Sequence, residues 1–219
     1  MMPVMVVAAL VFAATVGSQP WTQEILGKVA ETAARRHTVS YSGTRTYAMR
    51  NYRFNKEARV TVRMTYQPGE GKHFTVLDRS GSDRLLDIIQ QIIDTEVEAS
   101  RPGEILRKGL TPENYAARLR GTDTTGGREC WVLEVKPRSK SKFLINGTAW
   151  VDKSTFDVVR LDGVTSASLS IWVGTPRIVE DRAEFDGIWL PARLKSRSST
   201  LLTGESELDI AYTGYQIQR

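Results

Sequence analysis

Cysteine and histidine are scarce in this sequence of 219 residues. The chain has one cysteine, Cys130, and two histidines, His37 and His73. A single cysteine excludes an internal disulfide framework and a cysteine-rich zinc site. Two histidines leave little material for acid–base catalysis or metal ligation by imidazole. We therefore expect no metal, no cofactor and no catalytic residue, and the sequence argues against an enzyme.

Long apolar runs are also scarce, and the single one lies at the amino terminus. It covers residues 4–16, which is shorter than the ~20 residues that cross a bilayer, so a multi-span membrane protein is excluded. Small residues follow the run, a pattern typical of a secretory signal peptide. We predict a signal peptide at residues 1–18 and a single exported, periplasmic domain at residues 19–219. An uncleaved inner-membrane anchor is the alternative, because residues 1–18 contain no Lys or Arg.

The charge balance is mildly basic. Thirty Lys and Arg against twenty-five Asp and Glu leave a net charge of +5, within an ordinary globular composition of 41% hydrophobic and 25% charged residues. Most cations alternate with apolar residues, so we expect no nucleic-acid partner. One basic patch stands out, and it is either a solvated connection or a docking site for anionic headgroups or an acidic protein: Lys136, Arg138, Lys140 and Lys142.

Two periodicities organise the rest of the chain. A four-residue spacing predicts a helix over residues 21–36, and a second helix follows Ser82, a suitable N-cap. A short third helix is expected at Thr111-Pro112-Glu113. The apolar stripe of the second helix consists of Leu85, Ile88, Ile89, Ile92 and Ile93.

Alternation with a period of two predicts strands over most of the remaining chain, and Asp186-Gly187 is a hairpin-turn signal. Strands that follow each other closely, with turns between them, favour an antiparallel sheet. We predict an α+β fold: a strongly curved antiparallel sheet, a half-barrel of about nine to eleven strands, with helices covering its concave face. The predicted strands include residues 39–50, 58–66, 73–78, 129–136, 143–151, 156–161, 168–173, 177–185, 189–198 and 205–218.

Three short patterns in the second half resemble the bacterial outer-membrane lipoprotein-sorting protein family, which has the LolA/LolB-like fold. They are GRECWVLEVKP at 127–137, WVDKSTFDVVR at 150–160 and EFDGIWLP at 184–191. The resemblance covers nearly the whole chain after the apolar run. It implies a curved sheet whose apolar hollow holds acyl chains of lipoproteins or other lipids, and helices that act as a lid. It carries over no catalytic residue.

The leading hypothesis is therefore a monomeric, non-enzymatic periplasmic protein that binds the acyl chain of a lipid or lipoprotein and carries it to the outer membrane. Peripheral contact with a membrane fits the basic balance. The alternative is an envelope interaction or sensor protein of the same fold that binds a protein partner. The predicted cavity residues are Val60, Val62, Met64, Leu133, Trp150, Leu194 and Ile210, and the lid is the apolar stripe of the second helix.

For several polar residues we expect structural roles and no chemistry. The resemblance implies an arginine inside the hollow that holds the lid closed, and Arg45, Arg50, Arg53 and Arg63 all qualify by strand position. We interpret Asp94, Glu96 and Glu98 as a solvated face of the second helix, because they point in different directions. We expect His37 to be a cation at a helix carboxyl terminus, His73 to be exposed, and Cys130 to lie in the polar phase of its strand.

Overall fold

The computed structural model describes residues 20–169 and 173–218, so the predicted signal peptide lies outside the described residues. The described chain forms a single ten-stranded sheet in the order β3-β2-β1-β10-β9-β8-β7-β6-β5-β4. Every neighbouring pair is antiparallel, and β3 and β4 are the two open edges. The strands are β1 (Ser40–Asn51), β2 (Lys56–Gln67), β3 (Gly71–Gly81), β4 (Tyr115–Thr125), β5 (Arg128–Pro137), β6 (Ile145–Asp152), β7 (Val158–Thr165), β8 (Arg177–Phe185), β9 (Ile188–Thr200) and β10 (Gly204–Gln218).

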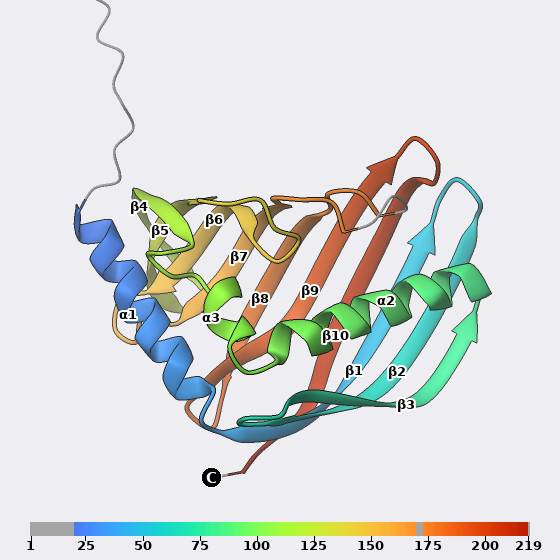
Figure 1. Cartoon of the computed structure of the whole chain (residues 1–219), viewed down its shortest axis with the longest axis horizontal. Helices are drawn as coiled ribbons and strands as arrows, with labels where there is room; N and C mark the ends of the chain where they lie inside the picture. Colours follow the sequence, from blue (N-terminus) through green and yellow to red (C-terminus); the bar gives the residue numbers. More distant parts are fainter. Residues whose placement is uncertain (1–19, 170–172, 219) are drawn as a thin grey trace, which may run out of the picture.

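Three helices lie on one side of this sheet, which curves around them (Figure 1). Helix α1 (Pro20–Arg36) buries Ile25, Leu26 and Val29 against β4 to β7. Helix α2 (Asp83–Ser100) buries its apolar stripe against β1, β2 and β10, and α3 (Glu104–Lys108) follows it. The α+β half-barrel with helices on the concave face is confirmed. In the described residues no helix is both long and apolar enough to cross a membrane.

Alternation along the strands explains which side chains face the helices. In β1 the buried residues are every second one, including Arg45, Tyr47 and Met49. Their partners across β2 and β10 share this inner face, for example Val60 and Ile210 opposite Tyr47. The sheet therefore has an inner, helix-covered face and an outer face with charged pairs such as Arg177–Asp162.

Turn chemistry joins the strands where the sequence predicted it. Asp186 and Gly187 both have positive φ angles, 49° and 79°, as a tight hairpin between β8 and β9 requires. The close pairing of β6 with β7 also needs a residue without a side chain. A Cβ on Gly147 would lie 2.1 Å from the carbonyl oxygen of Asp162 on the neighbouring strand β7.

Two predicted elements are wrong. Residues 111–114 form one turn, closed by the bond from the Tyr115 amide to the Thr111 carbonyl, and the chain then enters β4; the short helix α3 comes earlier. Thr111 does bond the Asn114 amide through its hydroxyl, so the capping chemistry is present, but a single turn satisfies it. The strand predicted over 168–173 is absent from its described residues, which form bends and a turn.

Candidate functional site

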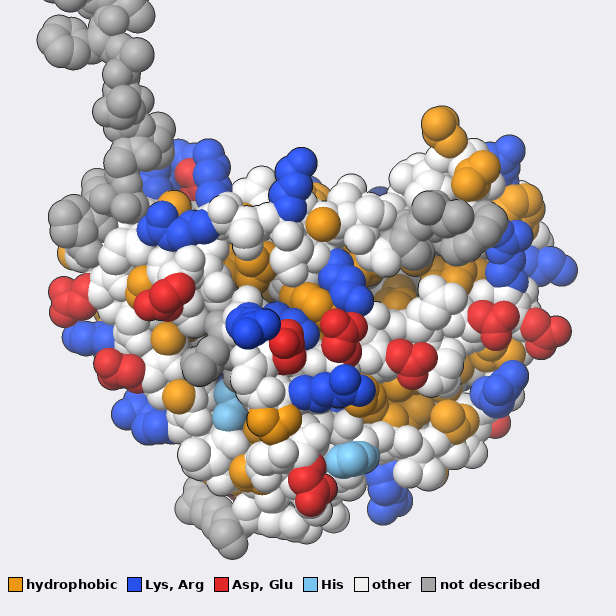
Figure 2. Space-filling view, viewed as in Figure 1, with side chains coloured by type: hydrophobic (Ala, Val, Ile, Leu, Met, Phe, Trp, Pro, Cys, Tyr) orange, Lys and Arg blue, Asp and Glu red, His pale blue; other side chains and the backbone are white. Residues whose placement is uncertain are grey.

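A hollow lies between α2 and the inner face of the sheet. Its cavity volume is about 410 Å³, and its walls come from α2, β1, β8, β9, β10 and the segment before β8. Figure 2 shows apolar side chains in recesses beside α2, with charged side chains along the helix. The apolar lining includes Met49, Ile88, Ile92, Leu169, Ile178, Leu194, Leu208 and Ile210. This volume falls within the range of small-molecule sites.

Polar residues line the hollow both from the sheet, which we call its floor, and from α2 and the loop before β6. Ser196, Ser198 and Ser206 project from β9 and β10, and Glu207 lies beside them. Lys142, Asp94 and Thr95 line the hollow from the loop before β6 and from α2. The hollow therefore combines an apolar wall with a hydroxyl-rich floor, as expected for a ligand with an apolar body and a polar group.

Helix α2 covers the hollow and contributes six of its lining residues, of which Ile88 and Ile92 are apolar. Ser82 occupies the N-cap position with extended backbone angles, and its carbonyl accepts the Leu85 and Leu86 amides. Within the apolar stripe, Leu85, Ile89 and Ile93 are buried in the core, whereas Ile92 is only partly buried. Ile88 and Ile92 face the hollow. Helix α2, which the sequence predicts to be a lid, therefore lies over the hollow with two apolar side chains facing it.

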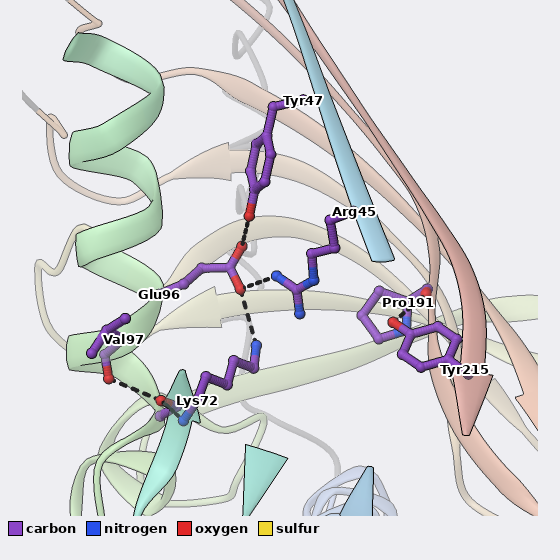
Figure 3. Close-up of polar contacts among 8 residues, drawn as sticks. Arg45, Tyr47, Lys72, Glu96, Val97, Pro191 and Tyr215 are labelled. Atoms are coloured by element: carbon purple, nitrogen blue, oxygen red, sulfur yellow. Dashed lines mark hydrogen bonds and ion pairs between the residues drawn. The ribbon is translucent and has the colours of Figure 1, made fainter. Parts of the chain in front are cut away.

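A buried ion-pair network joins α2 to the sheet (Figure 3). The Glu96 carboxylate of α2 accepts hydrogen bonds from Arg45 of β1 and from Lys72 of β3, the latter at 3.0 Å. The Tyr47 hydroxyl donates to the same carboxylate at 3.4 Å. Arg45 is 2% exposed, and its guanidinium lies 4.8 Å from the Tyr212 ring centroid and 5.2 Å from that of Phe74. Among Arg45, Arg50, Arg53 and Arg63, Arg45 is therefore the arginine that bonds to α2 from the inner face of the sheet.

Electrostatics hold this network in its ionised form. Burial alone would raise the pKa of Glu96, but Arg45 and Lys72 outweigh it and lower that pKa to about 2. Burial lowers the pKa of Lys72, and Glu96 counteracts this. Burial, followed by the charge of Glu96, raises the pKa of Tyr47 above its ordinary value. Glu96 is consequently a carboxylate at neutral pH, and the anchor of α2 is an ion pair.

The predicted cavity residues divide among several sites. Leu194 and Ile210 line the hollow. Val60 and Val62 lie beneath α2 in the core, while Met64 packs with Tyr41, Tyr66 and Leu190. Leu133 packs beneath α1. Polar substitution at Val62 or Leu133, both fully buried, would therefore act on the core.

Trp150 lies on the outer face of the sheet and not in the hollow. Its cross-strand partner is Val132, whereas Leu133 pairs with Ala149, so Trp150 and Leu133 face opposite sides. Trp150 packs with a small cluster formed by Cys130, Val159 and Trp189. Cys130 lies on this outer face, in the strand phase of Val132 and Glu134 as expected, and its neighbours bury it fully.

Three of the four residues in the basic patch contact other parts of the protein. Lys142 pairs with Glu98 of α2 at 3.0 Å, and Lys136 approaches Glu134 at 3.8 Å. Arg138 donates to the Pro112 carbonyl, and Lys140 is exposed. Of these four, Lys142 reaches the hollow.

The two histidines and Cys130 do not come together. His37 lies against Tyr66 on the inner face, 5.8 Å between ring centroids, and His73 approaches Glu70 on the surface at 3.6 Å. Burial, followed by the nearby Arg36, lowers the pKa of His37 to about 4, so His37 is neutral at pH 7 and the expected helix-capping cation is wrong. Arg35 and Arg36 occupy the last turn of α1 instead. The described residues contain no group of three or more His, Cys, Asp or Glu placed to hold a metal ion.

Glu96 is the functional residue that sequence reasoning misplaced. The expectation of a solvated face holds for Asp94, which is exposed, but not for Glu96. The available signal was its phase: Glu96 follows Ile92 by four residues and Ile93 by three, so it continues the apolar stripe. An acid in that phase indicates a buried partner.

No family model and no curated protein matches the sequence. Solved structures with a similar chain path include a LolA superfamily protein from Nitrosomonas europaea, 12% identical over 90% of this chain and 93% of that one, with a TM-score of 0.48. A candidate outer membrane lipoprotein-sorting domain from Vibrio parahaemolyticus is 12% identical over 87% of this chain and 91% of that one, with a TM-score of 0.48. A chain in the MucA/MucB complex of Pseudomonas aeruginosa is 10% identical over 86% of this chain and 93% of that one, with a TM-score of 0.30. The open antiparallel sheet with helices on its inner face is the half-barrel that the sequence predicted.

Proposed function

We propose that this chain is a non-enzymatic periplasmic protein that holds an acyl chain of a lipid or lipoprotein in the hollow under α2. The observation that carries the proposal is the lined cavity of about 410 Å³ beneath a helix held by a buried ion pair. Burying an acyl chain is worth about 0.8 kcal/mol for each methylene. The hydroxyl groups on the floor, together with Lys142, suit the polar end of such a ligand.

Helix α2 acts as the lid in this proposal. Its apolar side chains close the hollow, and Glu96 fastens it to Arg45. Release of that ion pair would free the helix at its carboxyl-terminal half while the stripe near Leu85 stays in the core. Export of residues 19–219 as one domain, after removal of residues 1–18, is part of the same proposal.

The test is native mass spectrometry of the exported chain, purified without detergent, followed by organic extraction of the same sample. We expect a co-purifying acyl lipid. Ser196→Phe fills the hollow from its floor and should lower lipid occupancy at least about tenfold, since the ring occupies ligand volume. Ala211→Phe is the matched control, because Ala211 is exposed on the outer face beside Thr46.

A chain that stays free of ligand after incubation with phospholipid and an acylated peptide would overturn the proposal. If folded Ser196→Phe and wild type have equal lipid occupancy, the lipid binds outside this hollow.

A second candidate function is the binding of an envelope protein partner, and the edge strand β3 favours it. This strand pairs with β2 on one side only, and Val76 and Leu77 are exposed on it. An open edge of this kind can accept an extended peptide as an added strand. A partner lost on Val76→Pro substitution, with lipid occupancy unchanged, would support this function.

A further inference from the structure

Two turns at one end of the sheet expose large apolar side chains. They join β1 to β2 and β9 to β10, and we call residues 52–55 and 201–203 together the paired tip. Leu201 is 97% exposed, Leu202 57%, Phe54 49% and Tyr52 46%. These are four of the eight large apolar side chains that are exposed in the described part of the chain. Figures 1 and 2 show both turns at the same end, with apolar side chains projecting from it.

Hydrogen bonds join the two turns into a single preformed projection. The Arg53 guanidinium donates to the Leu201 carbonyl at 2.8 Å. The Asn51 side-chain amide donates to the Thr203 carbonyl and to the Ser206 hydroxyl, both at 2.8 Å. Gly204 has a φ of +65°, and a Cβ there would lie 2.8 Å from the Cβ of Arg53. Because the turns are already ordered, the exposed side chains lose little conformational freedom when they bind.

The chemistry of the paired tip favours a membrane surface. It contains no acidic residue, Arg53 lies within it, and Lys56 follows directly. The Arg53 guanidinium lies 5.8 Å from the Phe54 ring centroid, and Arg50 lies 5.2 Å from that of Tyr52. Arg50 is paired with Glu57 at 3.4 Å, so the cations that the tip offers are Arg53 and Lys56. Apolar and aromatic side chains beside these two cations suit the boundary between headgroups and acyl chains of an anionic bilayer. The tip is also convex, which a deformable bilayer accepts directly, whereas a protein partner would need a matching pocket.

We infer that the paired tip inserts into the surface of an anionic phospholipid bilayer and docks the protein there. The inference goes beyond the proposed function, because docking requires no ligand in the hollow. Its position is nevertheless relevant to the hollow. Phe54 and Thr203 line a pocket of about 240 Å³ with Leu85, and this pocket shares Ile88 and Ser206 with the hollow. Docking would therefore bring this end of the hollow to the membrane.

The first experiment measures sedimentation with vesicles. The exported full chain, with its amino terminus identified by intact mass, is mixed with vesicles of phosphatidylcholine with or without phosphatidylglycerol. We expect binding that needs phosphatidylglycerol and weakens with salt. Leu201→Asp/Leu202→Asp should lower the partition coefficient at least about tenfold, because it removes two apolar anchors and adds two negative charges. Leu77→Asp is the matched control, since Leu77 is 52% exposed on the edge strand β3 and should change binding less than about twofold.

The second experiment reports on the tip itself and does not depend on the amino terminus. Leu202→Cys and Leu77→Cys variants are labelled with an environment-sensitive dye, which Cys130 escapes because it is fully buried. Anionic vesicles should shift the emission of the dye at position 202 to the blue and leave the dye at position 77 unchanged.

Equal binding of the double aspartate variant and wild type, or an unshifted dye at position 202, would overturn the inference. Binding to pure phosphatidylcholine vesicles that equals binding to vesicles with phosphatidylglycerol would overturn the requirement for an anionic headgroup. Capture of an envelope protein that needs Leu201 while vesicle binding does not would assign the tip to a protein partner instead. If the hollow holds no lipid but vesicle binding still depends on the paired tip, the proposed function is refuted and the inference is supported.

Discussion

Replacing Glu96 with glutamine should loosen α2 from the sheet. Glutamine keeps the size of the side chain but leaves the buried Arg45 without its counter-charge. Breaking a buried ion pair from one side costs about 3–5 kcal/mol. The change in the pKa of Glu96 from 4.5 to about 2 corresponds to roughly 3 kcal/mol, in agreement with that range. We therefore expect Glu96→Gln to lower the free energy of unfolding by about 3 kcal/mol.

Urea unfolding and amide hydrogen exchange would measure this change. If the loss is local, the amides of α2 should exchange about a hundredfold faster while the central strands stay protected. Glu98→Gln is the matched control on the same helix. Its partner Lys142 is 35% exposed, and exposed pairs contribute about 0–1 kcal/mol.

A double-mutant cycle separates the ion pair from the packing around it. Arg45→Met alone should also destabilise the protein, because it leaves Glu96 with only Lys72 and Tyr47. Arg45→Met/Glu96→Gln should cost less than the sum of the two single changes, Arg45→Met and Glu96→Gln, by more than about 1 kcal/mol. Additive effects, or a Glu96→Gln protein within about 0.5 kcal/mol of wild type, would refute the reasoning that the network anchors the lid.

Two further predictions concern the stability of the fold at acidic pH and the close contact between β6 and β7 at Gly147. Since the folded pKa of Glu96 is about 2 and its ordinary value is 4.5, the unfolded chain binds more protons between these pH values; the contribution of Glu96 is complete above pH 4.5 and is lost as the pH falls through 2. Urea midpoints should therefore fall between about pH 5 and about pH 3, and a slope unchanged in Glu96→Gln would contradict this cause. Gly147→Ala should lower the free energy of unfolding by at least about 2 kcal/mol in thermal melts, because the added Cβ would lie 2.1 Å from a backbone oxygen. Gly27→Ala in α1 is its control, since nothing lies within 4 Å of that Cβ and the change should stabilise the helix by about 0.5–1 kcal/mol; equal melting of the two variants would refute the clash.

The spacing of apolar residues and the turn residues predicted most helices and strands, because short-range interactions along the chain form these elements. The apolar stripe that begins at Leu85 identified α2, and its start after Ser82 agrees with the structure. The Asp-Gly pair identified the turn between β8 and β9, where both residues need positive φ. The prediction failed at Thr111, because the same capping residue serves a helix or a single turn before a strand.

The site was less predictable because it depends on register. Alternation separates two sets of side chains in a strand, but it does not say which set faces the helices. Trp150 and Leu133 were expected on one face, and the pairing of β5 with β6 places them on opposite faces. Irregularities at Trp150/Val151 and Asp181/Arg182 shift the phase again along the sheet.

The amino-acid sequence by itself determined the strand and helix pattern and the amphipathic character of α2, because these follow from the spacing of apolar residues along short segments. The open, curved antiparallel sheet also followed from strand patterns that succeed each other closely. Only the tertiary structure decided that Arg45 meets Glu96, that Leu194 and Ile210 line the hollow, and that Leu201 lies beside Arg53. These contacts join residues far apart in the chain, so they exist only once curvature and register bring ten strands into one sheet.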